Sequence, residues 1–227
     1  METTQSSDLE QVRIDDFPDR LGTGTTVLVA SAGAATRHGV PLRLLTRFAR
    51  AADSALVVST TESATRAASR FARHWSDESR PTLGFVDTTS RSQYVSAIYE
   101  EQPVVYTPAP GDLERLVLAL SDLSAVQVPA DSNRHLVVRS VTPLIEATSA
   151  ARVATILDRI VGLRSADGCT VLGIDYTAHD QESMSTLADC VEGVLWVTRP
   201  ASDRIELEFR STHRGPGASN RGEGRDG

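Results

Sequence analysis

The segment from His135 to Asp175, HLVVRSVTPLIEATSAARVATILDRIVGLRSADGCTVLGID, contains the pattern from which we predict the fold. It begins and ends with short β-branched runs, His135–Ser140 and Thr170–Asp175. Between them, Ser149–Arg164 has apolar residues three and four positions apart, which places them on one side of a helix. A strand, a helix and a second strand in this order predict a right-handed crossover between parallel strands.

The same alternation continues through the rest of the chain. The other expected strands are Val27–Ser31, Ala55–Thr60, Thr82–Asp87, Val104–Thr107 and Val194–Thr198, and the other expected helices are Pro41–Ala52, Glu62–His74, Gly111–Leu123 and Asp180–Val191. Short apolar strands without polar alternation indicate a sheet that is covered on both faces. Ile205–Arg210 follows the turn-rich connection RPASDR and predicts a hairpin with Val194–Thr198. We therefore predict a three-layer α/β fold with a mostly parallel sheet and a C-terminal antiparallel hairpin.

Length and composition indicate a globular protein. The chain has 227 residues, of which 40% are hydrophobic, and no apolar run approaches the roughly 18 residues that a membrane helix needs. Its beginning is acidic and polar, without the basic start and apolar centre of a secretion signal. We expect a flexible acidic N-terminus over residues 1–20, one domain over 21–214 and a disordered glycine-rich tail over 215–227. We also expect a cytoplasmic location and no contact with a membrane.

The charges argue against a nucleic-acid partner. All 23 basic residues are arginines, and 30 acidic residues give a net charge of -7. Two groups of arginines share helix faces, Arg43, Arg47 and Arg50 on one helix and Arg66, Arg70 and Arg73 on the next. Such stripes can contact phosphates. Because the chain is acidic overall and only 5% aromatic, we interpret them as solvated or ion-paired faces instead.

Metal and hydrolase motifs are not found in the sequence. Cys169 and Cys190 match no metal-ligand spacing, and we expect small buried hydrophobes rather than a disulfide. In TAHDQES, His179 adjoins Asp180, which we interpret as a helix cap. Thr142 has no histidine at motif spacing, and no G-x-S-x-G elbow occurs. We therefore predict no metal site and no hydrolase activity.

The segment Val27–Phe48, VLVASAGAATRHGVPLRLLTRF, has the outline of a phosphate-binding loop between a strand and a helix. The pattern G-x-x-x-x-G-K-[ST] needs glycines to wrap phosphates, a lysine for the terminal phosphates and a hydroxyl for magnesium. The residues that align with the eight positions of this pattern are, in order, Ala30, Ser31, Ala32, Gly33, Ala34, Ala35, Thr36 and Arg37. Both required glycines are alanines, the lysine is a threonine and the hydroxyl residue is an arginine. The topology of a phosphate loop is retained without its chemistry.

Four stretches resemble one family: ALVVSTTESATR, LGFVDTTSR, VVYTPAPGDLERLVLALSDL, and the strand, helix and strand that begin with HLVVRSVTPLIEATS. Together they resemble the RecA-like ATPases of the KaiC group, especially the divergent KaiC-like proteins of halophilic archaea. The resemblance extends from Val27 to about Arg214. It implies a RecA-like P-loop NTPase fold with degenerate Walker A and Walker B motifs.

The same resemblance implies where a nucleotide pocket would have been. The strand that ends in a magnesium-holding aspartate in active members is followed here by Arg139, which cannot bind magnesium. Glu62 lies near the water-activating glutamate of the family, although we prefer the interpretation that it favours the start of a helix. Arg210 and Arg214 lie near a basic finger of some RecA-like subunits. The implied vestigial pocket comprises Gly33, Ala35, Thr36, Arg37, Glu62 and Arg139.

Two expectations follow for the site and the function. Arg37, Glu62 and Arg139 should form an ion-pair network in place of the nucleotide. The protein should be a catalytically degenerate, regulatory or scaffolding member of its fold, with no cofactor or metal and with a protein partner or a second copy as its ligand. Two alternatives stay open: a nucleotide-binding protein or slow ATPase with an atypical loop for ATP, and a nucleic-acid-binding relative of the recombinases.

Overall fold

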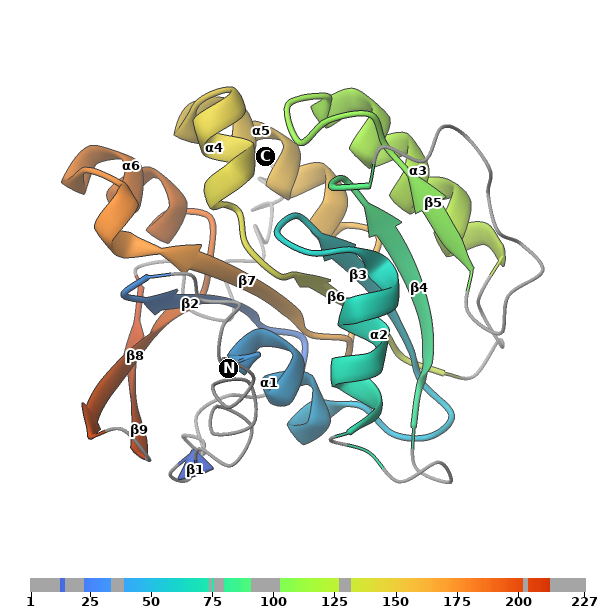
Figure 1. Cartoon of the computed structure of the whole chain (residues 1–227), viewed down its shortest axis with the longest axis horizontal. Coiled ribbons are helices and arrows are strands. Elements are labelled where there is room, and N and C mark those ends of the chain that lie inside the picture. The colour runs from blue at the N-terminus through green and yellow to red at the C-terminus, as the bar shows by residue number, and fades with distance from the viewer. Residues whose placement is uncertain are drawn as a thin grey trace, which may run out of the picture.

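The fold is a nine-stranded sheet between two layers of helices, seen in a computed structural model (Figure 1). The structure describes residues 13–14, 23–33, 39–73, 75, 80–90, 103–126, 132–201 and 204–212. The strands are β1 (Arg13–Ile14), β2 (Thr26–Ser31), β3 (Ser54–Ser59), β4 (Thr82–Asp87), β5 (Val104–Tyr106), β6 (Arg134–Val138), β7 (Thr170–Asp175), β8 (Gly193–Ala201) and β9 (Arg204–Ser211). The helices are α1 (Val40–Phe48), α2 (Ala64–Ala72), α3 (Leu113–Val126), α4 (Thr142–Ala147), α5 (Ala150–Val161) and α6 (Gln181–Ala188), with a short 3-10 helix at Tyr176–Ala178.

The strand order is β1-β9-β8-β2-β7-β6-β3-β4-β5. Every neighbouring pair is parallel except β8 and β9, which are antiparallel. One strand, β7, therefore separates β2, which precedes the phosphate-loop segment, from β6, which precedes Arg139. The predicted fold class, a RecA-like three-layer α/β fold with a mostly parallel sheet and a C-terminal antiparallel hairpin, is confirmed.

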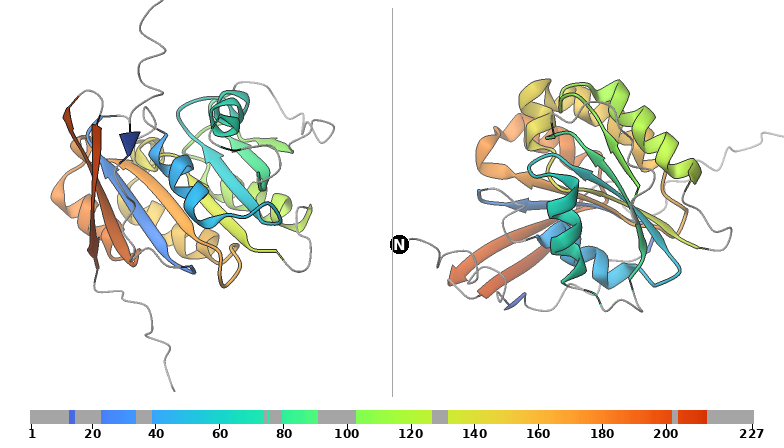
Figure 2. Two further views of the ribbon diagram at one scale, coloured as in Figure 1. Left: turned by 90° about the horizontal axis from the view of Figure 1, so that it is seen from below. Right: turned by 45° about the vertical axis from the view of Figure 1, so that its right-hand side comes forward.

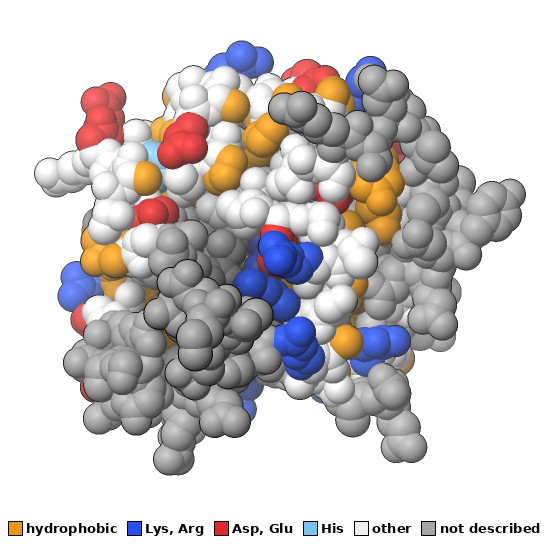
Figure 3. Space-filling model, in the orientation of Figure 1, with side chains coloured by type: hydrophobic (Ala, Val, Ile, Leu, Met, Phe, Trp, Pro, Cys, Tyr) orange, Lys and Arg blue, Asp and Glu red, His pale blue; other side chains and the backbone are white. Residues whose placement is uncertain are grey.

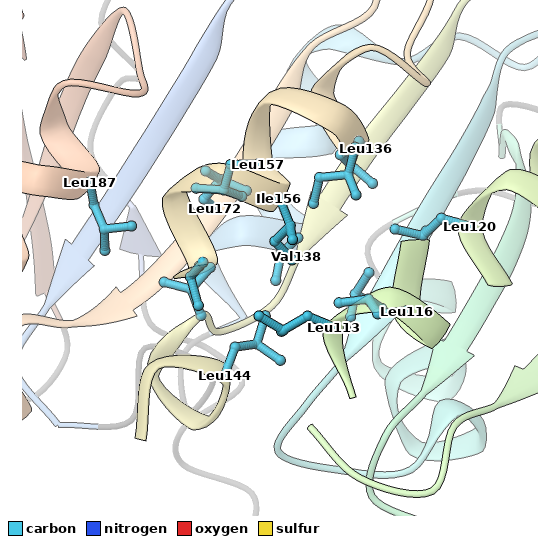
Figure 4. Close-up of a cluster of buried hydrophobic side chains, with 14 of the residues drawn as sticks. Leu113, Leu116, Leu120, Leu136, Val138, Leu144, Ile156, Leu157, Leu172 and Leu187 are labelled. Atoms are coloured by element: carbon cyan, nitrogen blue, oxygen red, sulfur yellow. The ribbon is translucent and has the colours of Figure 1, made fainter. Parts of the chain in front are cut away.

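Two hydrophobic cores lie on opposite faces of the sheet, because alternate strand residues point to opposite sides. In β2, Leu28 belongs to the core formed with α3, α4, α5 and α6, whereas Val27 and Val29 belong to the core formed with α1 and α2. Figure 4 shows the first core, where Leu136 and Val138 of β6 meet leucines of the covering helices. Figure 2 shows the helical layers from two further sides. Burial on both faces explains why the strands lack polar alternation.

Two elements were not expected from the sequence. Helix α4 has only six residues, too few for apolar periodicity to reveal it, although Pro143 in its first turn is a usual helix-start signal. Strand β1 lies within the segment predicted to be flexible and pairs in parallel with β9. The rest of that segment and the predicted C-terminal tail lie outside the described residues. Within the described ranges, no helix is both long and apolar enough to cross a membrane.

Candidate functional site

The candidate site lies at the carboxyl ends of the central strands. Parallel pairing sets Ser31 of β2 opposite Asp175 of β7, and Ser59 of β3 opposite Asp87 of β4. Arg139 follows β6 at the same edge and donates its backbone N–H to Val58 of β3. In open α/β sheets, ligands bind outside this edge of the strands. The loops that follow these strands are therefore the place to look for a site.

Arg139 and Glu62 form an ion pair at this edge. The guanidinium Nη1 of Arg139 contacts Oε1 of Glu62, and the two side chains are only 1% and 9% exposed. The other carboxylate oxygen of Glu62 lies 3.5 Å from Nε of Arg70 on α2, whose side chain is 39% exposed. Burial lowers the pKa of Arg139 to about 10, so its guanidinium stays charged at neutral pH. Glu62 thus lies between a buried and a half-exposed arginine.

The structure brings together two members of the predicted three-residue network. Arg37 lies outside the described residues, as do Ala35 and Thr36 of the expected pocket. The second arginine that contacts Glu62 is Arg70. Sequence reasoning interpreted the helix face that carries Arg70 as solvated or ion-paired, but it did not identify Glu62 as the partner.

Local hydrogen bonds explain the position of Glu62. Its carbonyl accepts a hydrogen bond from the hydroxyl of Ser59 at 2.5 Å. The next residue, Ser63, is the N-cap of α2 and accepts the backbone N–H of Arg66 at 3.4 Å. Our preferred interpretation, that Glu62 merely favours the start of this helix, is therefore wrong. The cap is Ser63, and the carboxylate of Glu62 turns to Arg139.

Gly33 of the phosphate-loop segment is held by a carboxylate. Its φ of 70° is in the left-handed region that favours glycine. Its N–H donates to Oδ1 of Asp175 at 3.1 Å. The same oxygen accepts the backbone N–H and the hydroxyl of Thr177 at 3.0 and 2.6 Å. A backbone N–H of this loop is thus bound to an internal anion.

Helix α1 begins close to the same place. It follows Gly39, which has a φ of 60°, and has no side-chain cap. A Cβ atom added to Gly173 of β7 would lie 2.2 Å from the carbonyl oxygen of Arg139 and 3.0 Å from Cγ of Pro41. Only glycine allows this approach of β7, the end of β6 and the first turn of α1. The segment between β2 and α1 therefore ends beside the Glu62–Arg139 pair.

Asp87 has a structural role at the end of β4. It accepts hydrogen bonds from the backbone N–H groups of Ala64, Thr89 and Ser90 and from the hydroxyl of Ser90, at 2.7 to 3.0 Å. Burial alone would raise the pKa of Asp87, but these donors lower it overall. The carboxylate thus joins the start of α2 to the loop after β4.

A hydroxyl and an imidazole also meet at this edge. Oγ1 of Thr142 lies 3.1 Å from Nε2 of His179 and accepts the backbone N–H of Asp175 at 3.0 Å. Sequence spacing missed this contact, because the two residues come from separate βα loops. Asp180 caps α6 through the N–H of Ser183 at 2.8 Å, so its predicted role as a helix cap is confirmed.

A second polar cluster lies at the amino ends of the strands. His135 of β6 places Nε2 3.3 Å from Oδ2 of Asp53 and accepts the backbone N–H of Cys169 at Nδ1, at 3.1 Å. The thiol of Cys169 lies 3.2 Å from the same nitrogen. Burial lowers the pKa of His135, against the opposing effect of Asp53, and raises the pKa of Cys169 to about 12. A buried thiol with this pKa is unreactive, which favours a structural role.

The remaining candidates are engaged in local contacts. Arg210 forms an ion pair with Glu208 at 2.9 Å and lies 5.9 Å from the ring centre of Trp196, whereas Arg214 lies outside the described residues. Cys190 is a partly buried thiol that donates a hydrogen bond to the carbonyl oxygen of Thr186 at 3.4 Å. In the part of the chain that the structure describes, no three His, Cys, Asp or Glu residues form a group that could hold a metal ion.

The strand order, with a mostly parallel sheet and a C-terminal antiparallel hairpin, is that of a RecA-like fold. The chain belongs to the family of unknown function DUF7504, whose family model matches residues 24–196. No curated protein matches the sequence.

Solved structures with similar folds share little sequence with this chain. The crystal structure of the uncharacterized protein PH0321 from Pyrococcus horikoshii, in complex with an unknown peptide, has a TM-score of 0.57 and 12% identity, over 83% of this chain and 84% of that chain. PH0250 from the same organism has a TM-score of 0.45 and 12% identity, over 82% and 86%. An ATPase of the type III secretion system of pathogenic bacteria has a TM-score of 0.45 and 13% identity, over 78% of this chain and 52% of its own. The chain thus spans about half of that ATPase.

Proposed function

We propose that this domain is a KaiC-like member of the RecA-like class that does not hydrolyse ATP and acts as a regulatory or scaffolding protein. The observation that carries the proposal is the buried ion pair between Arg139 and Glu62. These residues follow β6 and β3, at the positions where the family resemblance implies a magnesium-holding aspartate and a water-activating glutamate. A guanidinium occupies the first position and neutralises the carboxylate at the second.

This pair is incompatible with metal-assisted phosphoryl transfer. Magnesium needs oxygen ligands in near-octahedral geometry, and a guanidinium offers only donors and a repelling charge. Phosphoryl transfer depends on cations that neutralise the β- and γ-phosphates and on a residue that orients the nucleophile. Thr36 supplies no cation in place of the loop lysine. Glu62, already paired with two arginines, is a poor base for an attacking water.

A role in protein interaction has weaker but independent support. PH0321, a protein of similar fold, was crystallised with a peptide. A domain that keeps a stable α/β core without its catalytic groups retains surfaces on which a partner can bind. The lysine-free, acidic composition supports the finer resemblance to KaiC-like proteins of halophilic archaea, because an acidic surface keeps proteins dispersed in salt.

Calorimetric titration with ATP and magnesium, at both low and high potassium chloride, tests the loss of catalysis. We expect no saturable heat and no phosphate release above that of buffer. Magnesium-dependent turnover that disappears in the Glu62→Gln variant would overturn the proposal. Saturable ATP binding without turnover would favour the alternative of a nucleotide-binding protein with an atypical loop.

A further inference from the structure

The charged residues within helices α1 and α2 are all arginines, and Glu62, just before α2, contacts one of them, Arg70. Neither helix contains an acidic residue, and together they contain four arginines, with two more just beyond their ends: Arg43, Arg47, Arg50, Arg66, Arg70 and Arg73. Helix α1 contacts β6 and β7, helix α2 contacts β4, and both helices pack into the core on the same face of the sheet. Figure 3 shows basic side chains gathered over this part of the molecule. We call these six residues the arginine face.

The opposite helical layer has the reverse balance. Helices α3 to α6 contain five acidic residues, Glu114, Asp122, Glu146, Asp158 and Glu182, and three arginines, Arg115, Arg152 and Arg159. Their sum is three minus five, or -2, compared with +4 for α1 and α2. Because the whole chain carries -7, the arginine face is a local positive region on an acidic protein. Such separation of charge creates potentials that select ligands by sign.

The arginines of this face differ in how far their side chains are buried. Arg47, Arg50, Arg66 and Arg73 are exposed, whereas Arg43 and Arg70 are half-buried. Burial lowers the pKa of Arg43. Arg70 is also oriented by Glu62. Half-buried guanidinium groups lose less conformational freedom when they bind a carboxylate, which favours a bidentate contact.

We propose that the arginine face binds an acidic segment of a partner protein. The proposal rests on the proposed function, since it assigns a surface and a partner chemistry to the protein-interaction role. Guanidinium groups bind carboxylates with two parallel hydrogen bonds, and Arg-rich clusters recognise acidic motifs in this way. A short segment meets only the local positive potential, because charges beyond the Debye length of about 8 Å are screened at physiological salt.

A nucleic acid fits the same surface less well. A long polyanion that crosses the molecule would leave the arginine face and meet the acidic remainder of the surface. The aromatic residues nearest this face in the sequence offer no platform for base stacking, because Phe71 is buried in the core beneath it and Phe48 and Trp75 are packed against that core. A segment rich in aspartate and glutamate needs neither a long track of positive charge nor stacking.

Fluorescence anisotropy with a labelled twelve-residue Asp/Glu peptide, at about 0.15 M salt, tests the proposal on the full chain. The variant Arg47→Gln/Arg66→Gln/Arg73→Gln removes three exposed charges without touching the Glu62 contacts. The matched control Arg115→Gln/Arg152→Gln/Arg159→Gln removes the same charge from the opposite layer. We expect saturable binding that weakens about tenfold in the first variant and less than about twofold in the control.

Each other outcome overturns the proposal. No saturable binding, or equal weakening in both variants, would mean that the face is not a specific acidic-segment site. Tighter binding of a single-stranded oligonucleotide of equal length would make nucleic acid the occupant. Self-association that the first variant abolishes, measured by sedimentation, would make a second copy the occupant. The ATP titration is independent of these arms, so a failure of the docking surface is distinguishable from a failure of the proposed loss of catalysis.

Discussion

Glu62 and Arg139 follow β3 and β6, adjacent parallel strands, and their side chains meet where both strands end. The pair is almost completely buried, with exposed fractions of 9% and 1%. Burying two charges is costly unless they satisfy one another, and removal of one partner leaves the other charge uncompensated. The pair is therefore expected to matter more for stability when it is half removed than when it is fully replaced.

The first prediction concerns this asymmetry. Glu62→Ala should lower the free energy of unfolding by about 3 to 5 kcal/mol, because it leaves the Arg139 guanidinium buried without its carboxylate. The double variant Glu62→Ala/Arg139→Met should recover at least about 1 kcal/mol, since it removes the unpaired charge. Denaturant melts at fixed salt measure both. Glu114→Ala, which breaks an exposed pair with Arg159, is the control and should cost about 0 to 1 kcal/mol. Equal losses in the single and double variants would show that the unpaired Arg139 guanidinium carries no penalty of its own.

The second prediction concerns the close approach at Gly173. Gly173→Ala should cost about 2 kcal/mol or more, because its Cβ would lie 2.2 Å from the carbonyl oxygen of Arg139. Gly162→Ala is a milder control, since its Cβ would lie 3.3 Å from the carbonyl oxygen of Arg159, and should cost less than about 1 kcal/mol. Thermal or denaturant melts compare the two. Similar losses would contradict the packing of β7 against the end of β6.

The third prediction concerns pH. Burial lowers the pKa of His135, so the native state binds fewer protons than the unfolded chain below the ordinary histidine pKa of about 6.5. Stability from this group is therefore present above that pH and is lost as the pH falls below it. Protonation would also turn Nδ1, the acceptor for the Cys169 N–H, into a donor.

Urea melts between pH 7.5 and pH 5 test this dependence. His135→Asn should flatten it, because this change removes the group whose pKa burial lowers. A parent protein that is equally stable at both ends of the range would contradict the expected uptake of a proton by His135 on unfolding.

Asp53, the partner of His135, titrates in stronger acid. Burial alone would raise the pKa of Asp53, but its donors, the N–H groups of Arg50 and Asn133 and the ring of His135, lower it. Its own contribution is thus lost only in stronger acid, below about 3.9.

The fourth prediction concerns the two thiols. Because burial raises the pKa of Cys169 to about 12, this thiol should react with a disulfide reagent at pH 8 at least about tenfold more slowly in the native protein than in denaturant. The Cys190→Ser variant isolates its reaction, and the Cys169→Ser variant reports on Cys190. Rapid modification of native Cys190→Ser would mean that the cluster of Asp53, His135 and Cys169 opens readily.

The fold was largely predictable from the sequence, because strands buried on both faces appear as uninterrupted apolar runs. The expected Thr170–Asp175 coincides with β7, and the expected Thr82–Asp87 coincides with β4. Helix ends were less accurate: α1 ends at Phe48 rather than Ala52, since its apolar periodicity continues into residues that are not helical. Short α4 contains too few turns to generate a pattern.

The candidate site was predictable only where strand ends could be aligned with the family resemblance. The resemblance placed both Glu62 and Arg139 in the implied nucleotide pocket, and from this we expected them to form an ion pair. Two side-chain contacts depend on side-chain directions that no spacing rule encodes: that of Thr142 with His179, from separate loops, and that of Glu62 with Arg70 of the following helix. The buried cluster around His135 was missed for the same reason, since Asp53 and Cys169 come from other strands' amino ends.

The pair of Glu62 and Arg139 also differs from a bound nucleotide in how its contribution to stability depends on ligand concentration. A bound nucleotide stabilises a protein by an amount that rises and falls with the concentration of free ligand. The ion pair between Glu62 and Arg139 is intramolecular, so its contribution to stability does not depend on the concentration of a ligand. The pair therefore stabilises this edge of the sheet by an amount that no ligand concentration changes.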